Sequence, residues 1–256
     1  MKKIFFSTSI ILVVISLFYI LFWNLENKKV KATLKDTHKF TYIDYSNKKF
    51  AQNVKKYSFN KTNNIEKQIN FKKLNSTYKD AIAWININNT NIDFPLVQKN
   101  NNKFYLNHNI DGSYNSAGWP FIDYRNSLDI LSTNTTIYGH NRLDNSMFGT
   151  LSNCLKESWY KNKDNQHIIF STKNETYIFK IFSIYEVPAE SYFSTPYFES
   201  IEEHQNFLDT IVKRSIFNFN EPINISDKIL TVSTCSNNLK DRIIVHGKLI
   251  ESFVTE

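Results

Sequence analysis

Three side chains in this sequence could together carry out nucleophilic catalysis, and they belong to Cys235, His140 and Arg242. A cysteine attacks as its thiolate, and a nearby histidine can take up or return the proton. An arginine supplies a fixed positive charge and several N–H donors for an oxyanion that develops during the reaction. The three residue types therefore suit attack on a carbonyl group.

Predicted strands should bring these residues together. Cys235 and His140 each follow a strand-like run directly, and Arg242 opens the next run, seven residues after Cys235. A hairpin joining residues 229–235 to 242–250 would return Arg242 to the side of Cys235. Spacing alone does not establish a site, since two cysteines and six histidines offer such pairs in any chain. Taken singly, Cys235 fits a buried apolar position, His140 a structural or surface position, and Arg242 a surface salt bridge.

The fold class follows from short runs that are rich in Val, Ile, Thr, Tyr and Phe, which strands prefer. Turn residues separate these runs, and this pattern predicts an all-β barrel or sandwich. The predicted strands are residues 81–87, 93–97, 135–138, 167–170, 176–182, 229–233 and 242–245.

One helix is expected at about residues 200–215, where Ser200 and Glu203 form a capping-box pattern. Apolar residues follow at helical spacing, and they are Phe207, Leu208, Ile211 and Val212. The helix interrupts a connection of some forty residues between the strand that ends near Val187 and the strand that begins near Lys228. Connections of this length are unusual and often functional.

Composition excludes several protein classes. Hydrophobic residues make up 41% and charged residues 21% of the 256 residues, which is enough to build a core and excludes a wholly disordered chain. Two cysteines exclude a disulfide-dense scaffold and a cysteine zinc ribbon. The 14 tyrosines and 21 phenylalanines are assigned to strands and core rather than to a nucleic-acid stacking surface.

The positive charge is concentrated in the first third of the chain. Residues 1–80 hold 16 of the 31 Lys and Arg residues and 5 of the 24 Asp and Glu residues. The remaining residues 81–256 carry a small negative net charge. The net charge of +7 therefore belongs to an N-terminal stalk, which we interpret as a solvated, weakly helical tether, with contact to anionic lipid or polymer as the alternative. Some of the stalk could form helices that pack on the body.

Residues 4–23 contain no charged side chain, and they read IFFSTSIILVVISLFYILFW. Twenty helical residues span roughly 30 Å, the thickness of a bilayer's hydrocarbon core. No small-residue cleavage site follows, so an uncleaved signal-anchor is predicted, with Tyr19 and Trp23 near the outer interface. Lysines flank both ends of the run, but a three-residue N-terminus before a large domain favours an N-terminus inside the cell and a body outside.

Several stretches resemble the sortases, the cysteine transpeptidases that attach proteins to the Gram-positive cell wall, and specifically their class B. Thr231 to Ser236 is similar to the T-L-x-T-C signature, with Val232 in place of the usual Leu. The stretches occur in unbroken order over about residues 80–251, and they are Trp84-Ile85-Asn86-Ile87 with Ile92-Asp93-Phe94-Pro95-Leu96-Val97-Gln98, Asn102-Lys103-Phe104-Tyr105-Leu106, Gly118-Trp119-Pro120-Phe121-Ile122-Asp123-Tyr124-Arg125-Asn126, Tyr138-Gly139-His140-Asn141, Ser146-Met147-Phe148-Gly149-Thr150-Leu151, and Thr231-Val232-Ser233-Thr234-Cys235-Ser236 followed by Arg242-Ile243-Ile244-Val245.

The resemblance implies a mainly β chain with a sortase-type closed barrel of about eight strands, N-terminal helices and a helix before the nucleophile strand. It also implies a membrane-anchored transpeptidase that needs no cofactor and no metal. Cys235 would attack the Thr carbonyl of a C-terminal sorting signal, His140 would protonate the leaving amine, and Arg242 would stabilise the oxyanion or hold the signal. An amine of a lipid-linked peptidoglycan precursor would then accept the acyl group. Two alternatives are a pilin-polymerising sortase with a Lys acceptor and a catalytically idle barrel that binds a partner.

The resemblance further implies that Asn102, Leu106 and Ser233 line the groove for the sorting signal. The apolar run, the charge distribution and the resemblance together divide the chain into a cytoplasmic tail (residues 1–3), a transmembrane signal-anchor (4–24), a basic stalk with N-terminal helices (25–80) and a catalytic barrel (81–256). The partners implied are secreted proteins that carry the signal, the cell-wall precursor and the membrane, with no nucleic acid.

Four more residues could belong to the site, and each has a simpler role. Cys154 lies among apolar residues and fits the core, although a disulfide with Cys235 would be possible outside the cell. His246 shares strand parity with Arg242 and could approach the site, but a structural role is favoured. Asp123 and Asp144 could orient His140, but both more readily cap turns.

Overall fold

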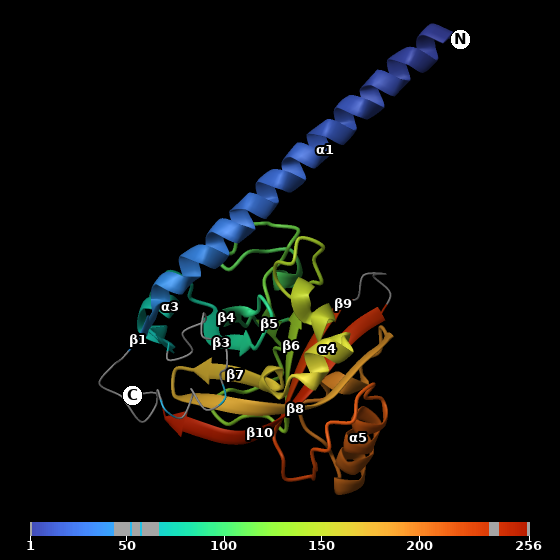
Figure 1. Cartoon of the computed structure of the whole chain (residues 1–256). Coiled ribbons are helices and arrows are strands. Elements are labelled where there is room, and N and C mark those ends of the chain that lie inside the picture. The colour runs from blue at the N-terminus through green and yellow to red at the C-terminus, as the bar shows by residue number, and fades with distance from the viewer. Residues whose placement is uncertain (1, 44–51, 53–56, 58–66, 236–240, 255–256) are drawn as a thin grey trace.

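The computed structural model describes residues 2–43, 52, 57, 67–235 and 241–254, and the side chains of residues 2–8, 43, 67 and 235 lie outside that description. Eight strands of the described chain close into a barrel in the order β10-β8-β7-β3-β4-β5-β6-β9 (Figure 1). The barrel strands are β3 (Ala81–Ile87), β4 (Asp93–Val97), β5 (Phe121–Ile122), β6 (Asn134–Gly139), β7 (His167–Thr172), β8 (Glu175–Pro188), β9 (Ile229–Cys235) and β10 (Asp241–Val254). The predicted closed barrel of about eight strands is confirmed.

Helices and one small sheet surround the barrel. The sheet pairs β1 (Thr41–Ile43) with β2 (Lys67–Ile69). The α-helices are α1 (Lys2–Thr37), α3 (Phe71–Thr77), α4 (Glu157–Lys161) and α5 (Ile201–Lys213). Short 3-10 helices are η1 (His38–Phe40), η2 (Phe104–Leu106), η3 (Gly149–Leu155), η4 (Lys163–Asn165) and η5 (Tyr192–Ser194).

The barrel interior holds the main hydrophobic core. Aliphatic and aromatic side chains from facing strands fill it, among them Ile85, Phe94, Phe170, Phe179 and Val232, each no more than 1% exposed. Such burial of apolar surface is the main driving force for folding. Because successive side chains of a strand point to opposite faces, Trp84 of β3 belongs to a second core outside the barrel, which also contains Val30 of α1 and Leu74 of α3.

All seven strands predicted from the sequence are present; β5 of the barrel and the small sheet of β1 and β2 were missed. Only two residues of β5 pair, with Val97 of β4 on one side and with β6 on the other. A strand this short shows no periodicity in its sequence. Strands β8 and β10 are longer than predicted because they pair with each other along almost their whole length, across two register shifts.

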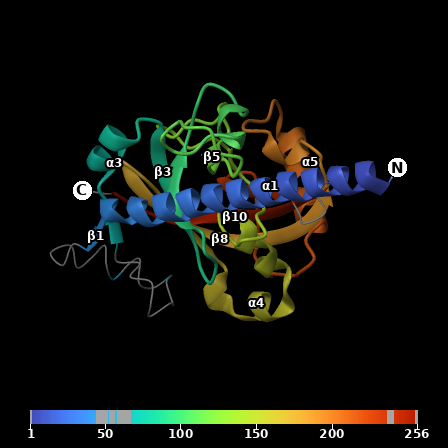
Figure 2. The same cartoon turned by 90° about the horizontal axis from the view of Figure 1, so that it is seen from above.

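Helix α1 is continuous from the apolar run into the body, where the sequence suggested a tether. The apolar part of α1 is exposed, and among the described residues it is the helix that is long and apolar enough to cross a bilayer. Its N-terminal half projects away from the barrel (Figure 1), and seen from above α1 crosses over the body (Figure 2). Val30 and Thr37 are fully buried and Leu34 packs against the core, so the residues after the run form a contact face at helical spacing.

Helix α5 forms where the sequence predicts it. The Ser200 hydroxyl accepts a hydrogen bond from the Glu203 backbone N–H at 3.1 Å, and the Glu203 carboxylate accepts one from the Glu199 N–H at 2.8 Å. Phe207, Leu208 and Ile211 are buried in a third core under β8, whereas the fourth predicted apolar position, Val212, is 43% exposed. The helix packs against the side of the barrel (Figure 1).

Candidate active site

Three neighbouring strands bring the backbones of the predicted catalytic residues to one edge of the barrel. Strands β6 and β9 run parallel, with Gly139 opposite Thr234, so their C-terminal ends meet at the same edge. His140 follows Gly139 directly. Strand β10 returns antiparallel to β9 and places Arg242 opposite Cys235. The predicted hairpin is therefore confirmed for the backbone, while the Cys235 side chain lies outside the described part of the chain.

His140 is held through one ring nitrogen. Its Nε2–H donates a hydrogen bond of 2.7 Å to the carbonyl oxygen of Leu106. A carbonyl oxygen can only accept, so Nε2 must carry the hydrogen in this contact. The Nδ1 atom is then the nitrogen left to exchange a proton. Leu106, predicted from the resemblance as a groove residue, thus contacts His140 through its backbone, and its side chain is 43% exposed.

The Leu106 carbonyl is fixed by a close approach of Gly118. A Cβ atom at Gly118 would lie 2.5 Å from the Tyr105 carbonyl oxygen and 2.7 Å from the Leu106 carbonyl oxygen. Gly118 also has φ of +60°, a conformation that costs other residues energy. The next residue, Trp119, donates its backbone N–H to the Tyr105 carbonyl at 2.9 Å. The absence of a side chain at Gly118 therefore leaves room for the carbonyl that His140 bonds, which the motif Gly118-Trp119 did not reveal.

Asn102 belongs to a polar cluster around Asp123. The Asn102 side chain donates to Asp123 Oδ2 at 2.9 Å and accepts from the Tyr124 N–H at 3.0 Å. Asp123 is buried, and it also accepts from the Arg125 guanidinium at 2.7 and 2.9 Å and from the Tyr138 hydroxyl at 3.0 Å. Burial alone would raise the pKa of Asp123, but the hydrogen bonds from Arg125 and Asn102 hold it below its ordinary value.

Arg125 links this cluster to η5. Its guanidinium donates to the carbonyl oxygen of Ser194 at 2.9 Å as well as to Asp123. Arg125 was not singled out from the sequence, although it lies two residues after Asp123 in the motif of residues 118–126, which was noted there. The signal that could have found it is the i, i+2 pairing of a carboxylate with an arginine inside that motif.

Neither aspartate considered as a partner of His140 is bonded to it. Within the described residues, the side-chain hydrogen bonds of Asp123 go to Asn102, Arg125 and Tyr138, and those of Asp144 go to Arg142 and Ser146. Each carboxylate accepts the backbone N–H two residues ahead, at 2.9 Å for Asp123 and 3.1 Å for Asp144. Both residues thus cap turns, as favoured from the sequence.

Ser233, the third predicted groove residue, is buried between neighbouring strands. It lies opposite Tyr138 of β6 and Ile244 of β10 and is 0% exposed. Its hydroxyl has no hydrogen-bond partner within the part of the chain that the structure describes. Ser233 therefore lies two residues before Cys235 on the same strand with an unused polar atom, and its role in binding stays a prediction.

His246 belongs to a buried ring of hydrogen bonds rather than to the reaction edge. On one side of the imidazole, the Tyr192 hydroxyl donates to the Tyr185 hydroxyl, which bonds His246 Nε2. On the other side, His246 Nδ1 bonds the Thr231 hydroxyl, which bonds the Asn134 side chain. Asn134 donates to the carbonyls of Phe193 and Thr195, next to Tyr192, and all these distances are 2.6 to 3.0 Å. The Thr231 hydroxyl donates to Asn134, so it accepts from His246 Nδ1–H. The Tyr185 hydroxyl accepts from Tyr192, so its own hydrogen is donated to His246 Nε2, and the imidazole is neutral. The structural role favoured for His246 is confirmed.

Acid should destabilise the protein through His246. Burial lowers the pKa of His246 from 6.5 to about 3. Below pH 6.5 the unfolded chain takes up a proton that the folded chain refuses, so stability is lost as the pH falls toward 3. By pH 5 the loss is about 2 kcal/mol, or roughly 4–8 °C in melting temperature. Melting curves at pH 7.5 and 5 should show this difference reduced in His246→Gln. Equal pH slopes in the two proteins would contradict a neutral buried imidazole.

Cys154 is a free thiol in the barrel core. It is 0% exposed, and burial raises its pKa well above the ordinary value. Its neighbours in the core include Leu151 and Trp159. The core assignment is confirmed, and the alternative of a disulfide with Cys235 is wrong, because Cys154 is a free thiol.

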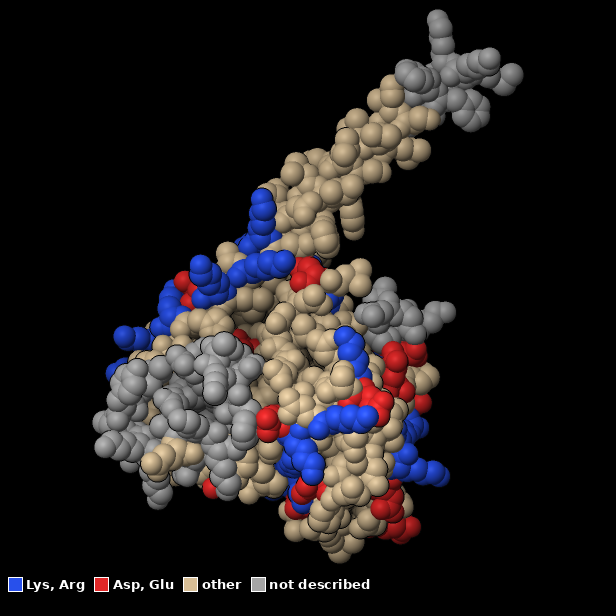
Figure 3. Space-filling model, in the orientation of Figure 1, with Lys and Arg blue, Asp and Glu red and all other residues tan. Residues whose placement is uncertain are grey.

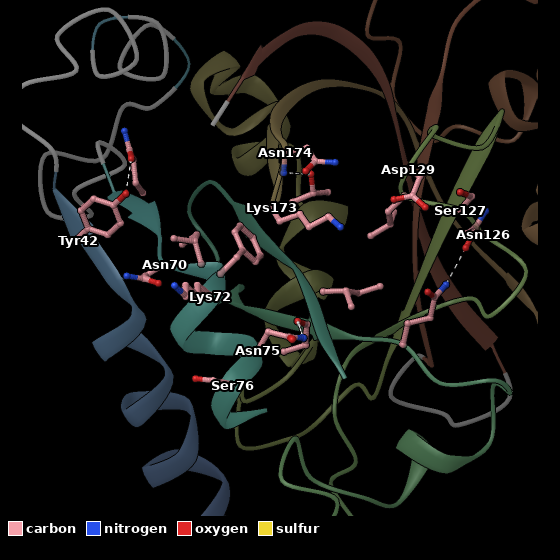
Figure 4. Close-up of a pocket in the computed structure, with 18 residues that line it drawn as sticks. Tyr42, Asn70, Lys72, Asn75, Ser76, Asn126, Ser127, Asp129, Lys173 and Asn174 are labelled. Atoms are coloured by element: carbon pink, nitrogen blue, oxygen red, sulfur yellow. Dashed lines mark hydrogen bonds between the residues drawn. The ribbon is translucent and has the colours of Figure 1, made fainter. Parts of the chain in front are cut away.

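A pocket of about 1010 Å³ lies away from the reaction edge (Figure 4). Its walls come from β2, α3, the loop 126–129 and the turn between β7 and β8, and they present side-chain amides and the charged groups of Lys72, Asp129 and Lys173. Next to it, the Tyr42 hydroxyl donates to Gln68 at 2.8 Å. The described walls pair no nucleophile with a base, so this pocket does not compete with the edge of β6, β9 and β10 as the site of chemistry.

Comparison with known proteins places the whole barrel in one family. Residues 85–250 match the family described as Sortase domain. The chain is 33% identical over 184 residues to sortase B of Staphylococcus aureus, covering 71% of this chain and 75% of that relative. It is 30% identical over 255 residues to sortase B of Listeria monocytogenes, covering 97% and 98% of the two chains. The solved Staphylococcus aureus sortase B–substrate complex matches with a TM-score of 0.71 and 29% identity, over 89% of this chain and 99% of that one.

The sequence match and the structural match extend over the same barrel. The motifs that resemble class B sortases lie on β3, β4, β6, β9 and β10 and on the loops that contact His140. The two relatives at 30% identity or more cover 71% and 97% of the chain. The chain therefore belongs to the sortase family, in class B, and is a cysteine transpeptidase.

Proposed function

We propose that this enzyme cleaves a C-terminal sorting signal of secreted proteins after Thr and transfers the acyl group to an amine of a cell-wall precursor. The observation that carries the proposal is the meeting of β6, β9 and β10 at one edge, with Arg242 opposite Cys235 and His140 beside them. The Staphylococcus aureus relative has been solved as a complex with its substrate, which supports a peptide as the ligand of this fold.

In the first step, the Cys235 thiolate attacks the Thr carbonyl carbon and forms a C–S bond. The C–N bond to the next residue breaks, and the departing amine takes a proton from His140. Because Nε2–H is bound to Leu106, Nδ1 is the nitrogen that takes the proton of the Cys235 thiol as the thiolate forms, and it then gives this proton to the amine. In the second step, His140 removes a proton from the acceptor amine, the new C–N bond forms, and the C–S bond breaks to return the thiolate.

The other predicted site residues fit this scheme as binding groups. The Arg242 guanidinium stabilises the oxyanion of the tetrahedral intermediate or holds the backbone of the signal. Asn102, fixed by Asp123, and the exposed side chain of Leu106 would line the groove. The buried hydroxyl of Ser233, which has no hydrogen-bond partner among the described residues, would support the groove from the strand that ends at Cys235. These assignments make the polar cluster around Asp123 a support for substrate binding.

We further propose that α1 anchors the enzyme in the cell membrane with the catalytic body outside the cell. The apolar part of α1 is exposed and long enough to cross a bilayer. The lysines that follow it gather where the helix meets the body, and residues 9–25 before them carry no charge (Figure 3). A body held there can meet both the secreted clients and a lipid-linked peptidoglycan precursor.

A peptide library tests the acyl-enzyme step and the signal together. The full chain in lipid nanodiscs is incubated with pooled peptides of the form x-Pro-x-Thr-x and analysed by intact mass spectrometry. An adduct on Cys235 that ends at Thr is expected. Addition of a cell-wall peptide amine should then release the adduct faster than a pilin-like Lys peptide. A reactive Cys235 that forms no adduct with any signal peptide would contradict the proposal.

Replacing Gly118 by alanine should slow adduct formation about 10- to 100-fold, because the new Cβ atom displaces the Leu106 carbonyl that holds His140. The matched control is Gly112→Ala. Gly112 also has positive φ, at +79°, but a Cβ atom there meets nothing within 4 Å. The control variant therefore has the same kind of backbone strain but does not displace the Leu106 carbonyl. Equal rates in the two variants would show that strain, and not the position of His140, causes the loss.

A further inference from the structure

Helix α1 is bonded to two loops of the catalytic body directly after its apolar run. The Ser116 hydroxyl donates to the Glu26 carboxylate at 2.6 Å, and Lys29 donates to the Ser113 hydroxyl at 2.8 Å. The Arg142 guanidinium donates to the Asn27 side chain, which is buried. The loops 107–118 and 141–147 are thus attached to α1 within its first turn beyond Leu25, and Figure 1 shows them beside the helix.

The position of these bonds along α1 sets the level of the two loops in a membrane. Asn27 lies four residues after Trp23, which is predicted at the outer interface, so it is about 6 Å further along the helix axis. The polar headgroup layer on each side of a bilayer is about 5–7 Å thick. Glu26 and Asn27, which hold Ser116 and Arg142, therefore lie at the level of the headgroups, and Lys29, which holds Ser113, lies about 9 Å from Trp23, just beyond them.

Each loop exposes one large apolar side chain next to its attachment. Tyr114, between Ser113 and Ser116, is 64% exposed, and Leu143, which follows Arg142, is 86% exposed. Single exposed apolar residues are common on soluble proteins. These two differ because both flank residues bonded to α1, and because Lys28, Lys29 and Lys31 stand on the same stretch of helix. Lysines at this level attract anionic headgroups.

We propose that the loops 107–118 and 141–147 form a membrane-docking face, with Tyr114 and Leu143 inserted into the headgroup region of an anionic bilayer. The proposal rests on the anchoring of α1 described above and goes beyond it, since an anchored body need not touch the membrane. A lipid surface is the partner that fits this face, because the face lies at the same height along α1 as the end of the apolar run. His140 lies two residues before Arg142, so docking would open the reaction edge at the membrane surface, where a lipid-linked amine is found.

Lipid quenching of a fluorophore tests the docking face. The full chain carrying Cys235→Ala is reconstituted in vesicles that contain anionic and brominated lipids. Single variants Leu143→Cys, Tyr114→Cys, Ile130→Cys and Val14→Cys are labelled with an environment-sensitive fluorophore. Cys154 is fully buried and stays unlabelled. Ile130 is the matched control, because it is 79% exposed but lies before the start of β6, whereas His140 follows the end of that strand. Ile130 is therefore at the opposite end of β6 from the proposed face.

We expect strong quenching at positions 14, 114 and 143 and several-fold weaker quenching at position 130. Quenching at 14, with 114 and 143 no different from 130, would overturn the docking face and leave the anchor in place. Quenching absent at 14 would overturn both. Neither result touches the transpeptidation itself, which is measured separately as the peptide adduct on the chain with native Cys235.

Discussion

Replacing Cys235 by alanine is expected to abolish the thioacyl adduct completely and to leave the melting temperature almost unchanged. The residue is the last of β9, and the backbone of this strand is fixed by β6 on one side and β10 on the other. Those ladders do not depend on the sulfur atom, whereas the C–S bond does. Intact mass spectrometry with the sorting-signal peptides and a melting curve of the same sample measure the two effects.

The second cysteine provides the matched control, with the opposite pair of results. Cys154→Ala removes a buried sulfur from the barrel core, so a cost of about 1–2 kcal/mol in the free energy of unfolding is expected. Its adduct on Cys235 should form as in the parent enzyme. An adduct on the Cys235→Ala chain, or loss of the adduct in Cys154→Ala with the fold intact, would show that the nucleophile has been assigned wrongly.

His140→Gln is expected to lower kcat/KM for the peptide by 10²- to 10⁴-fold, the usual contribution of a general acid–base group. Glutamine can still donate an N–H to the Leu106 carbonyl, so the local packing is retained. It cannot carry a proton to the leaving amine. The steady-state rate measured over pH 5 to 9 should therefore lose the dependence on pH that the histidine causes.

The control for this variant is His38→Gln, a substitution at a partly exposed histidine near Asp93 and Trp84. It should leave the rate and the pH profile unchanged. If His140→Gln kept more than about a tenth of the parental kcat/KM, proton transfer by this residue would not limit the reaction, and its hydrogen bond to Leu106 would be its main role.

The barrel could be predicted from the sequence because its strands carry their own signals. The runs 81–87 and 93–97 match β3 and β4 residue for residue, since their apolar residues are buried on both faces and turn residues bound them. The α5 cap was predictable for a similar reason, because Ser200 and Glu203 act within one turn. Local patterns of this kind need no knowledge of the rest of the fold.

The supports of the candidate site could not be predicted, because they depend on contacts between distant residues. The hydrogen bond between His140 and Leu106 ends on a backbone carbonyl, which every residue has. The attachment of Arg142 to Asn27 joins positions more than a hundred residues apart. Strand β5 exists only because β4 and β6 lie on either side of it. Tertiary structure decides such features, and no short segment encodes them.

The buried ring that passes through His246 also determines the register of β9 against β6 and β10. A slide of β9 by two residues would keep every side chain on its proper face, so the alternation of apolar residues does not forbid it. The same slide would carry Thr231 away from both Asn134 and His246 and leave buried donors and acceptors unpaired. The ring therefore selects one alignment of β6, β9 and β10 among those that the hydrophobic pattern allows, and it is this alignment that sets Arg242 opposite Cys235.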